Sequence, residues 1–290
     1  MFFEVLLIRH IRLDAALLLG FTIGGGLLTK SSAQFSLYLL PFSLLLFNFH
    51  QPKSKQKLIK WLGLATLATI ISLAFSWIIK LSPLQHMVGQ KNLTFIYSFE
   101  EFFQNPFQHL IGNLKGLMNW FVGYLTWPWI IGLILSAIIA LKNYFRTTVL
   151  LLAWWLFPFL TLATFGKVLY PRFILFMVFP LLIILAYGLT QVNKFIKNRL
   201  LLVAYCLLLV SYPAYISFQL LFNPLSAPIP KADRLQFMDD WPSGYGIKEI
   251  NEFIRSEAAK GPLFFATEGT FGLTPYAQMI YLQGTPNLEI

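Results

Sequence analysis

About seven apolar runs, separated by short polar segments, occupy most of the first 222 residues of the chain. Each run is long enough to cross the hydrocarbon core of a bilayer as a helix. The second run is short and contains Pro41, so a re-entrant hairpin is an alternative for it. The predicted spans are residues 13–29, 33–49, 61–79, 117–141, 147–165, 173–191 and 200–222. This pattern predicts an all-α polytopic membrane bundle over residues 1–222.

Residues 1–12, MFFEVLLIRHIR, place their cations after the apolar stretch, which is the reverse of the order in a signal peptide. We expect this segment to be the end of an earlier membrane helix. The chain is then expected to be the later part of a longer protein.

Residues 95–116, between the third and fourth runs, carry apolar side chains at three- and four-residue steps with polar side chains between them. This pattern is typical of amphipathic helices that lie in the membrane interface, and Pro106 divides the segment into two short helices. Such helices either cover the bundle or form the rim of a lipid-facing active site. Glu100 and Glu101 lie on the polar face, where a carboxylate accepts a proton or is simply solvated.

The last 68 residues have a different character, because acidic residues become frequent after a proline-rich segment. Residues 223–245 are expected to form a linker. Beyond it, the pattern predicts a helix over 246–261, a buried strand over 262–269 and a second helix over 274–282, with a further strand beginning near the end. Residues 246–290 are therefore expected to be a small, incomplete α/β domain.

Composition and charge agree with a membrane protein. Of the 290 residues, 57% are apolar and only 12% are charged, with a net charge of +10. Lys and Arg gather in every second loop, at residues 9–12, 53–60, 142–146 and 194–199. The positive-inside rule places these loops in the cytoplasm. Segment 80–116, loop 166–172 and the C-terminal domain are then extracytoplasmic.

No acidic side chain lies between Asp14 and Glu100, or between Glu101 and Asp233. Cations set among apolar runs without acids indicate anionic partners, namely membrane lipid headgroups and phosphates rather than nucleic acid. Proton-coupled transporters usually need acids or histidines within their spans. The pattern therefore disfavours a pump or an ion-driven carrier.

The positive-inside rule does not account for cations on the expected outer side, and three of these, Lys30, Lys167 and Arg172, are candidates for a binding site. Lys30 follows the glycines at 24–26, which allow another helix to approach closely. Loop 165–173 supplies Lys167, Tyr170 and Arg172 within a few residues. An Arg fork is a preferred phosphate ligand, although Lys and Arg at such places also anchor helices to lipid headgroups.

Other candidate chemistry is sparse. His86 and His109 lack the spacing of metal ligands, so no metal site is predicted. Cys206 is the single cysteine, which precludes an intrachain disulfide. No nucleotide-binding loop or nucleophile elbow is found, and no cofactor is indicated.

The segments GGGLLTKSS (24–32) and YPRFILFMVFPLLIILAYGL (170–189) carry a resemblance to a known family. With the C-terminal domain after the last span, they make the chain resemble the GT-C glycosyltransferases of the protein-mannosyltransferase and lipid A aminoarabinose-transferase type. The first segment is similar to that family's glycine-rich helix ending in an LTK-type motif. The second is similar to its arginine–aromatic entry into a proline-containing helix. The resemblance covers the later part of a family member.

The resemblance implies transfer of a sugar from a polyprenyl-phosphate carrier to a protein, lipid or glycan acceptor on the outer face of the membrane. It implies that Lys30, Lys167 and Arg172, with Tyr170, bind the carrier phosphate as it leaves. The family's general base lies in an earlier outer loop that this sequence does not match. Glu100 and Glu101 are weak candidates for that role here. The alternative is a non-catalytic membrane protein that binds or translocates polyprenyl-linked glycans, as a flippase or polymerase partner.

Overall fold

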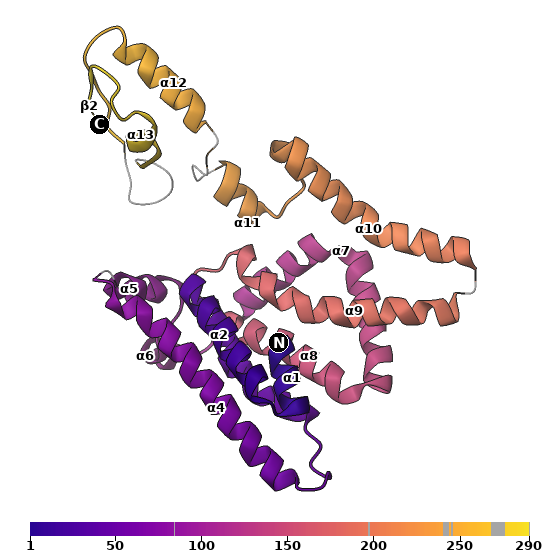
Figure 1. The fold of residues 1–290 in the computed structure, drawn as a ribbon. Coiled ribbons are helices and arrows are strands. Elements are labelled where there is room, and N and C mark those ends of the chain that lie inside the picture. Colours follow the sequence, from indigo (N-terminus) through magenta and orange to yellow (C-terminus); the bar gives the residue numbers. More distant parts are fainter. Residues whose placement is uncertain (84, 197, 240–243, 245, 268–275, 290) are drawn as a thin grey trace. The chain divides into compact units, whose positions relative to one another are not determined.

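The computed structural model describes residues 1–83, 85–196, 198–239, 244, 246–267 and 276–289. Helices account for 80% of the structure. The chain divides into two compact units, Met1–Val210 and Ser211–Ile290. The first unit is helical, and the short strands belong to the second (Figure 1).

Five helices in the described part of the chain are long and apolar enough to cross a membrane. They are α4 (Ser54–Ile78) extended by η3 (Ile79–Leu81), α7 (Leu110–Asn143), α8 (Phe145–Phe165), α9 (Leu175–Phe195) preceded by η4 (Pro171–Ile174), and α10 (Arg199–Phe222). These correspond to the last five predicted spans. The chain thus has the helices of a membrane protein.

The predicted count of seven spans is not confirmed, because the first two helices are shorter. Helix α2 (Leu13–Thr29) has 17 residues. The predicted span 33–49 is instead a chain of short pieces: η1 (Ser31–Ala33), α3 (Gln34–Leu39) and η2 (Leu40–Leu46). Pro41 lies in the first turn of η2, where its missing N–H and its ring prevent α3 from continuing as an α-helix.

Helix α1 (Phe2–His10) precedes α2 and packs with α2, η2 and α4 around a buried apolar cluster. Small residues bring α2 and α4 close together, as expected from the glycine-rich end of α2. A Cβ added at Gly24 would lie 2.7 Å from Cβ of Phe75. The Ser72 hydroxyl donates to the Gly20 carbonyl across the same interface, at 3.1 Å. Glycine therefore sets the spacing of these two helices.

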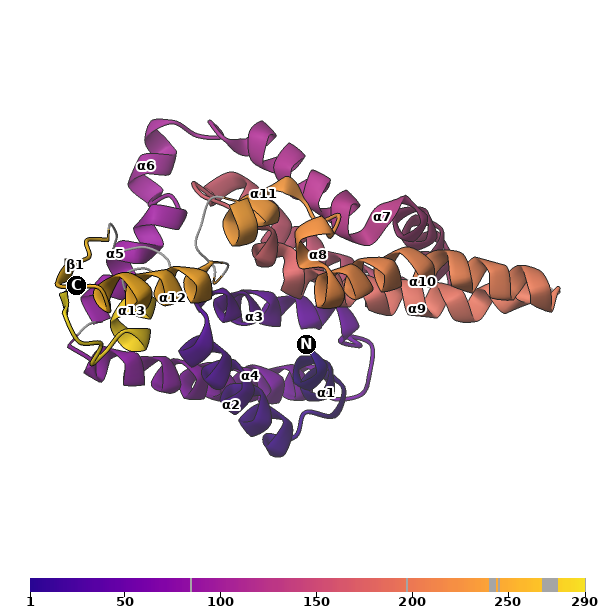
Figure 2. The same ribbon diagram turned by 90° about the horizontal axis from the view of Figure 1, so that it is seen from above.

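Helices α7, α8 and α9 form the other part of the first unit, packed around their own buried clusters. Figure 2 shows α7, α8 and α9 grouped together in this part of the unit. Helix α7 is interrupted at Thr126, whose φ of 65° and ψ of 158° are not helical. Nearby, the Trp129 indole donates to the Leu209 carbonyl at 2.5 Å. That carbonyl lies four residues before Pro213, which has no N–H to offer it.

The segment expected at the membrane interface contains more helix than the sequence pattern predicts. Helix α5 (Gln85–Phe95) precedes α6 (Phe99–Gln104), which ends just before Pro106. The second predicted short helix is the beginning of α7, which starts at Leu110 and continues as a long helix. Phe99 and Phe103 are each 74% exposed. Their exposure leaves an apolar face on α6, as an interfacial helix requires.

The predicted α/β domain is not confirmed, because the described part of the second unit contains little sheet, although its elements follow the order helix, strand, helix, strand. After η5 (Pro224–Ser226), the expected linker includes α11 (Lys231–Arg234) and the short π-helix η6 (Leu235–Asp239). Then follow α12 (Ile247–Ala258), β1 (Leu263–Phe264), α13 (Tyr276–Tyr281) and β2 (Leu288–Glu289). Strands β1 and β2 pair in parallel, with Leu263 opposite Leu288. The predicted strand residues 268–269 and helix residues 274–275 lie outside the described residues.

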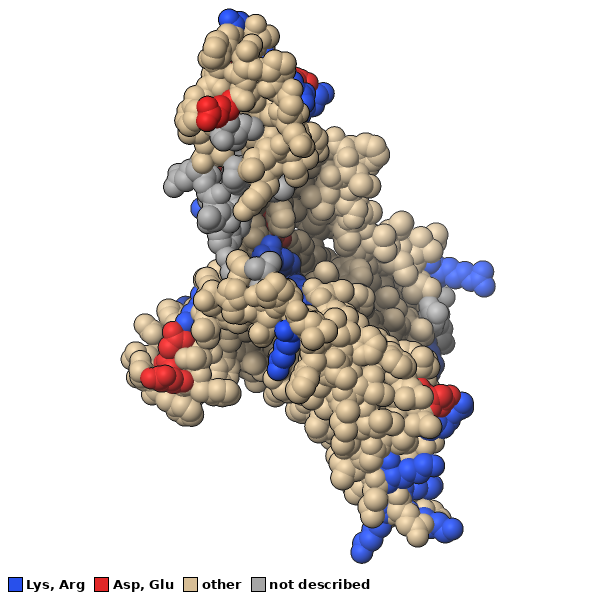
Figure 3. All heavy atoms as spheres, turned by 60° about the vertical axis from the view of Figure 1, so that its left-hand side comes forward, with Lys and Arg blue, Asp and Glu red and all other residues tan. Residues whose placement is uncertain are grey.

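Charged side chains on the face shown in Figure 3 lie mainly toward the ends of the first unit, and its flank is nearly free of charge. At the end where α4 begins, Lys53, Lys55, Lys57 and Lys60 are all exposed. Of the loop at 194–199, Lys197 lies outside the described residues. An uncharged flank with cations at the ends fits helices that cross a lipid bilayer.

Candidate functional site

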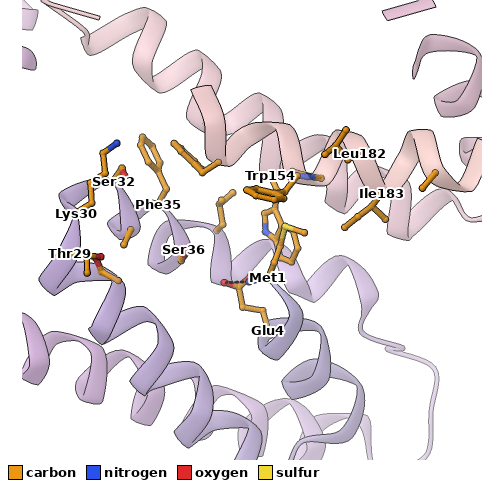
Figure 4. A pocket seen from close by; sticks show the side chains of 17 residues that line it. Met1, Glu4, Thr29, Lys30, Ser32, Phe35, Ser36, Trp154, Leu182 and Ile183 are labelled. Atoms are coloured by element: carbon orange, nitrogen blue, oxygen red, sulfur yellow. Dashed lines mark hydrogen bonds and ion pairs between the residues drawn. The ribbon is translucent and has the colours of Figure 1, made fainter. Parts of the chain in front are cut away.

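A cavity of about 700 Å³ lies among α1, α2, η1, α3, α8 and α9 (Figure 4). This volume is within the range of small-molecule sites, roughly 300–1,000 Å³. Helix α9 supplies a largely apolar wall, with Phe176, Phe179, Pro180, Leu182, Ile183 and Ala186. In Figure 4, Thr29, Lys30 and Ser32 lie on one side of the cavity, and Leu182 and Ile183 lie on the other. The cavity thus has a polar end and an apolar end.

Lys30 is held where α2 ends. Its backbone is extended, and its N–H still donates to the Gly26 carbonyl at 2.9 Å. The side chain is exposed and its Nζ lies 5.5 Å from the centre of the Phe173 ring. A cation at this distance from an aromatic face is stabilised by the ring quadrupole. Lys30 therefore lines the cavity and also contacts η4 through Phe173.

Arg172 approaches the same ring from within η4. Its guanidinium carbon lies 5.7 Å from the Phe173 ring centre and 4.7 Å from that of Tyr170. Pro171 is buried at the start of η4 and fixes the backbone immediately before Arg172. Among the described residues, neither Lys30 nor Arg172 forms an ion pair. Two unpaired cations on one ring create a local positive potential that attracts an anion.

Aromatic rings hold this pair of cations in place. Phe95, at the end of α5, contacts both Tyr170 and Phe173 edge-on, with ring centres 6.2 Å apart in each case. Tyr170 and Phe173 also contact each other edge-on, at 5.8 Å. Such edge-to-face pairs are favourable beyond the area that they bury. The cluster Phe95–Tyr170–Phe173 therefore positions the Arg172 side chain.

Lys167 has a different environment from Lys30 and Arg172. Its Nζ lies 2.6 Å from Glu101 Oε1, 3.2 Å from the Leu93 carbonyl and 5.0 Å from the Tyr97 ring centre. Glu101 itself closes a capping box with Ser98 at the start of α6. The ion pair thus joins the loop after α8 to the first turn of α6.

Backbone pairing reinforces the connection between this loop and the segment before α6. Ile96 and Gly166 form an antiparallel bridge, and the Tyr97 N–H donates to the Phe165 carbonyl at 2.8 Å. From α7, the Asn113 amide donates to the Ala163 and Gly166 carbonyls at 3.0 and 2.8 Å. The amide satisfies carbonyls at the end of α8 that have no helical partner.

The Glu101 carboxylate is stabilised in its ionised form. The hydrogen bond from Lys167 lowers the pKa of Glu101 below its usual value, and the Ser98 backbone N–H lowers it further. A general base needs a pKa near the working pH. Glu101 is therefore poorly suited to take a proton while Lys167 holds it.

The structure separates the predicted phosphate-binding residues into two groups. Lys30, Arg172 and Tyr170 lie around Phe173, whereas Lys167 pairs with Glu101. Glu100 is exposed on α6. His109 stacks on Tyr97, with ring centres 5.6 Å apart. No group of three or more His, Cys, Asp or Glu side chains able to hold a metal ion is found in the described part of the chain.

Two residues that the sequence patterns did not single out line the cavity, namely Glu4 and Trp154. Glu4 is only 1% exposed. The sequence pattern does not single out Glu4 because it lies ahead of the first predicted span, in a segment predicted to be the end of another helix. The signal available was an acid in an otherwise apolar stretch, FFEVLLI. Trp154 resembled any other apolar residue of its span.

Comparison of the chain with protein-family models, with curated proteins and with solved structures found no match. Function is therefore inferred from the cavity and its side chains.

Proposed function

We propose that the chain belongs to a membrane glycosyltransferase whose polyprenyl-phosphate-linked sugar donor binds in the cavity beside α9. The observation that carries the proposal is the shape of this site. An apolar wall from α9 leads to Lys30, and Arg172 shares the Phe173 ring with Lys30. An amphiphile with an anionic head and an apolar chain is complementary to that arrangement.

The phosphate of the donor is bound, in this proposal, by Lys30 and Arg172. The Arg172 fork supplies paired hydrogen bonds to phosphate oxygens, and Lys30 adds a compact positive charge. As the sugar is transferred, negative charge accumulates on the departing phosphate. Fixed cations stabilise that charge most when water is excluded from the site.

Lys167 has a positioning role in this proposal. Its ion pair with Glu101 ties α6 to the loop that leads into Tyr170 and Arg172. The sugar and its acceptor would then meet on the extracytoplasmic side, near α6.

Replacement of Glu100 or Glu101 by Gln should leave sugar transfer by the active protein within severalfold of wild type. A loss of several orders of magnitude would instead identify that glutamate as the base.

A non-catalytic role in binding or translocating a polyprenyl-linked glycan is the second candidate. This role is favoured by the ion pair between Glu101 and Lys167. The pair lowers the pKa of Glu101 and leaves this carboxylate unsuited to take a proton. Release of labelled sugar from a polyprenyl-phosphate donor onto an acceptor in proteoliposomes separates the two candidates. Only the enzyme produces glycosylated acceptor.

Donor binding is tested with farnesyl phosphate and farnesol, measured against the purified protein in detergent. Loss of one charge-assisted hydrogen bond corresponds to about a tenfold weaker affinity or more. Lys30→Gln and Arg172→Gln should each weaken farnesyl phosphate binding by about that factor and leave farnesol binding unchanged.

Lys80→Gln is the matched control, because Lys80 also lies over an aromatic ring, at 4.7 Å from the Trp77 ring centre, but does not line the cavity. Equal affinity of all three variants and wild type for farnesyl phosphate would refute the proposed site. An equal loss in Lys80→Gln would show that the effect is one of general surface charge.

A further inference from the structure

Glu4 is a buried acid on the wall of the cavity. Its side chain comes from α1 and is 1% exposed. One carboxylate oxygen, Oε1, lies 3.4 Å from the Met1 backbone nitrogen. The other, Oε2, has no hydrogen-bond partner in the described part of the chain. A buried acceptor left without a partner is costly, and in a membrane bundle it indicates a functional role.

Trp154 presents the complementary group on the same cavity. It lies on α8, is 3% exposed, and its indole Nε1 also has no partner among the described residues. In Figure 4 the Met1 side chain lies next to both Trp154 and Glu4. Methionine is unbranched and flexible, so it is able to move aside for a ligand. Two of the residues that line the cavity therefore carry an unsatisfied acceptor and an unsatisfied donor.

The chemistry of these two atoms selects the ligand group. A carboxylate oxygen only accepts, and an indole N–H only donates. A hydroxyl donates to the first and accepts from the second. An ammonium group has no lone pair for Trp154, and a second anion would be repelled by Glu4. Among common ligand groups, a hydroxyl satisfies both without placing a net charge in the cavity.

We infer that the cavity binds an anionic amphiphile that also carries a hydroxyl group, and that this hydroxyl is recognised by Glu4 and Trp154. The inference rests on the proposed function, because it takes the anionic group to be bound at Lys30. It adds a second recognition point, away from the phosphate. The two points together would make the site selective for ligands with a hydroxyl at a fixed distance from the anion.

The test uses a series of ω-hydroxyalkyl phosphates of increasing chain length, each compared with the unsubstituted alkyl phosphate of the same length. At one chain length, the hydroxyl should improve binding to the wild-type protein by about tenfold, as expected for a hydrogen bond to a charged group. Glu4→Leu and Trp154→Phe should each reduce this ratio of affinities to about one. The ratio is unaffected by any general change in protein stability.

Trp61→Phe is the matched control, because Trp61 is also 3% exposed with an unpartnered indole nitrogen but does not line the cavity. Trp61→Phe should retain the wild-type ratio of the affinities for the ω-hydroxyalkyl phosphate and the unsubstituted alkyl phosphate.

Persistence of this ratio in both cavity variants, or absence of a gain from the hydroxyl at every chain length, would overturn the inference while leaving the phosphate site intact. If ω-aminoalkyl phosphates bind more tightly than the ω-hydroxyalkyl phosphates, the group recognised by Glu4 is an organic cation, and the inferred hydroxyl is wrong. Failure of every alkyl phosphate to bind would overturn the proposed function as well.

Discussion

Gly188 is the position where one added methyl group should most disturb the wall of the cavity. It lies on α9, two residues beyond the cavity-lining Ala186, and faces Ser136 on α7. A Cβ built at Gly188 would lie 1.7 Å from Ser136 Oγ, 2.3 Å from its Cβ and 2.8 Å from its Cα. Rotation of the serine side chain relieves only the first of these contacts. Gly188→Ala therefore forces the two helices apart.

The magnitude follows from two opposing terms. Alanine gains up to about 1 kcal/mol over glycine in a helix interior. Overpacking of a close interface usually costs about 1–3 kcal/mol, occasionally more. Because the clash reaches the backbone of α7, we expect the cost to be at or above the top of that range. The net loss in the free energy of unfolding should be about 2 kcal/mol or more. Each kcal/mol lowers Tm by roughly 2–4 °C for a unit of this size.

Thermal unfolding in detergent measures this effect. The quantity recorded is the amount of protein that remains monodisperse on size exclusion after heating to each temperature. Gly63→Ala is the control, because a Cβ at Gly63 meets nothing within 4 Å. It should leave Tm unchanged or raise it slightly. Ser136→Gly combined with Gly188→Ala should recover part of the loss, with a coupling of about 0.5–3 kcal/mol. A Gly188→Ala protein as stable as wild type would refute the close α7–α9 packing.

Three further predictions concern the contacts around the site. Because the pKa of Glu101 is lowered in the folded protein, its pair with Lys167 stabilises the loop above the usual Glu pKa, about 4.3. Protection of that loop against hydrogen exchange, relative to the intrinsic exchange rate at each pH, should therefore be lost as the pH falls below that value, and Glu101→Gln should abolish this loss. Trp129→Phe removes the donor to the Leu209 carbonyl and should cost about 1–3 kcal/mol in thermal unfolding; an unchanged Tm would mean that water replaces the indole. Asn113→Ala removes two hydrogen bonds from the loop and should speed tryptic cleavage after Lys167 severalfold, whereas equal cleavage rates would contradict its role.

The apolar periodicity predicted most of the helical framework. Five predicted spans agree with helices of the structure to within several residues at most ends, because continuous apolar runs of this length have few other stable states. The second predicted span differs because Pro41 interrupts the helix and the segment folds as short turns against its neighbours. Pro41 is visible in the sequence, but whether it kinks or ends a helix depends on the helices that pack around it.

The candidate site was predictable only in part. Lys30 and Arg172 were selected as cations that orientation does not explain, and they do lie around one ring. Lys167 satisfied the same criterion but pairs with Glu101, which is 66 residues away in the chain. Sequence spacing carries no information about such a partner. For the same reason, Trp154 could not be assigned to a cavity before α8 was placed against α1 and α3.

By itself, the sequence determined that this is a chain of long apolar helices with cations confined to the ends and loops, because hydrophobic length and charge are local properties. It also determined which residues were available to bind an anion. The tertiary structure decided which of them work together. The position of Glu4 and Trp154 on one cavity, the shared ring at Phe173 and the pairing of Lys167 arise from contacts between helices distant in sequence. Such contacts depend on how helices pack, and packing is set by shape across interfaces and not by the pattern of any one segment.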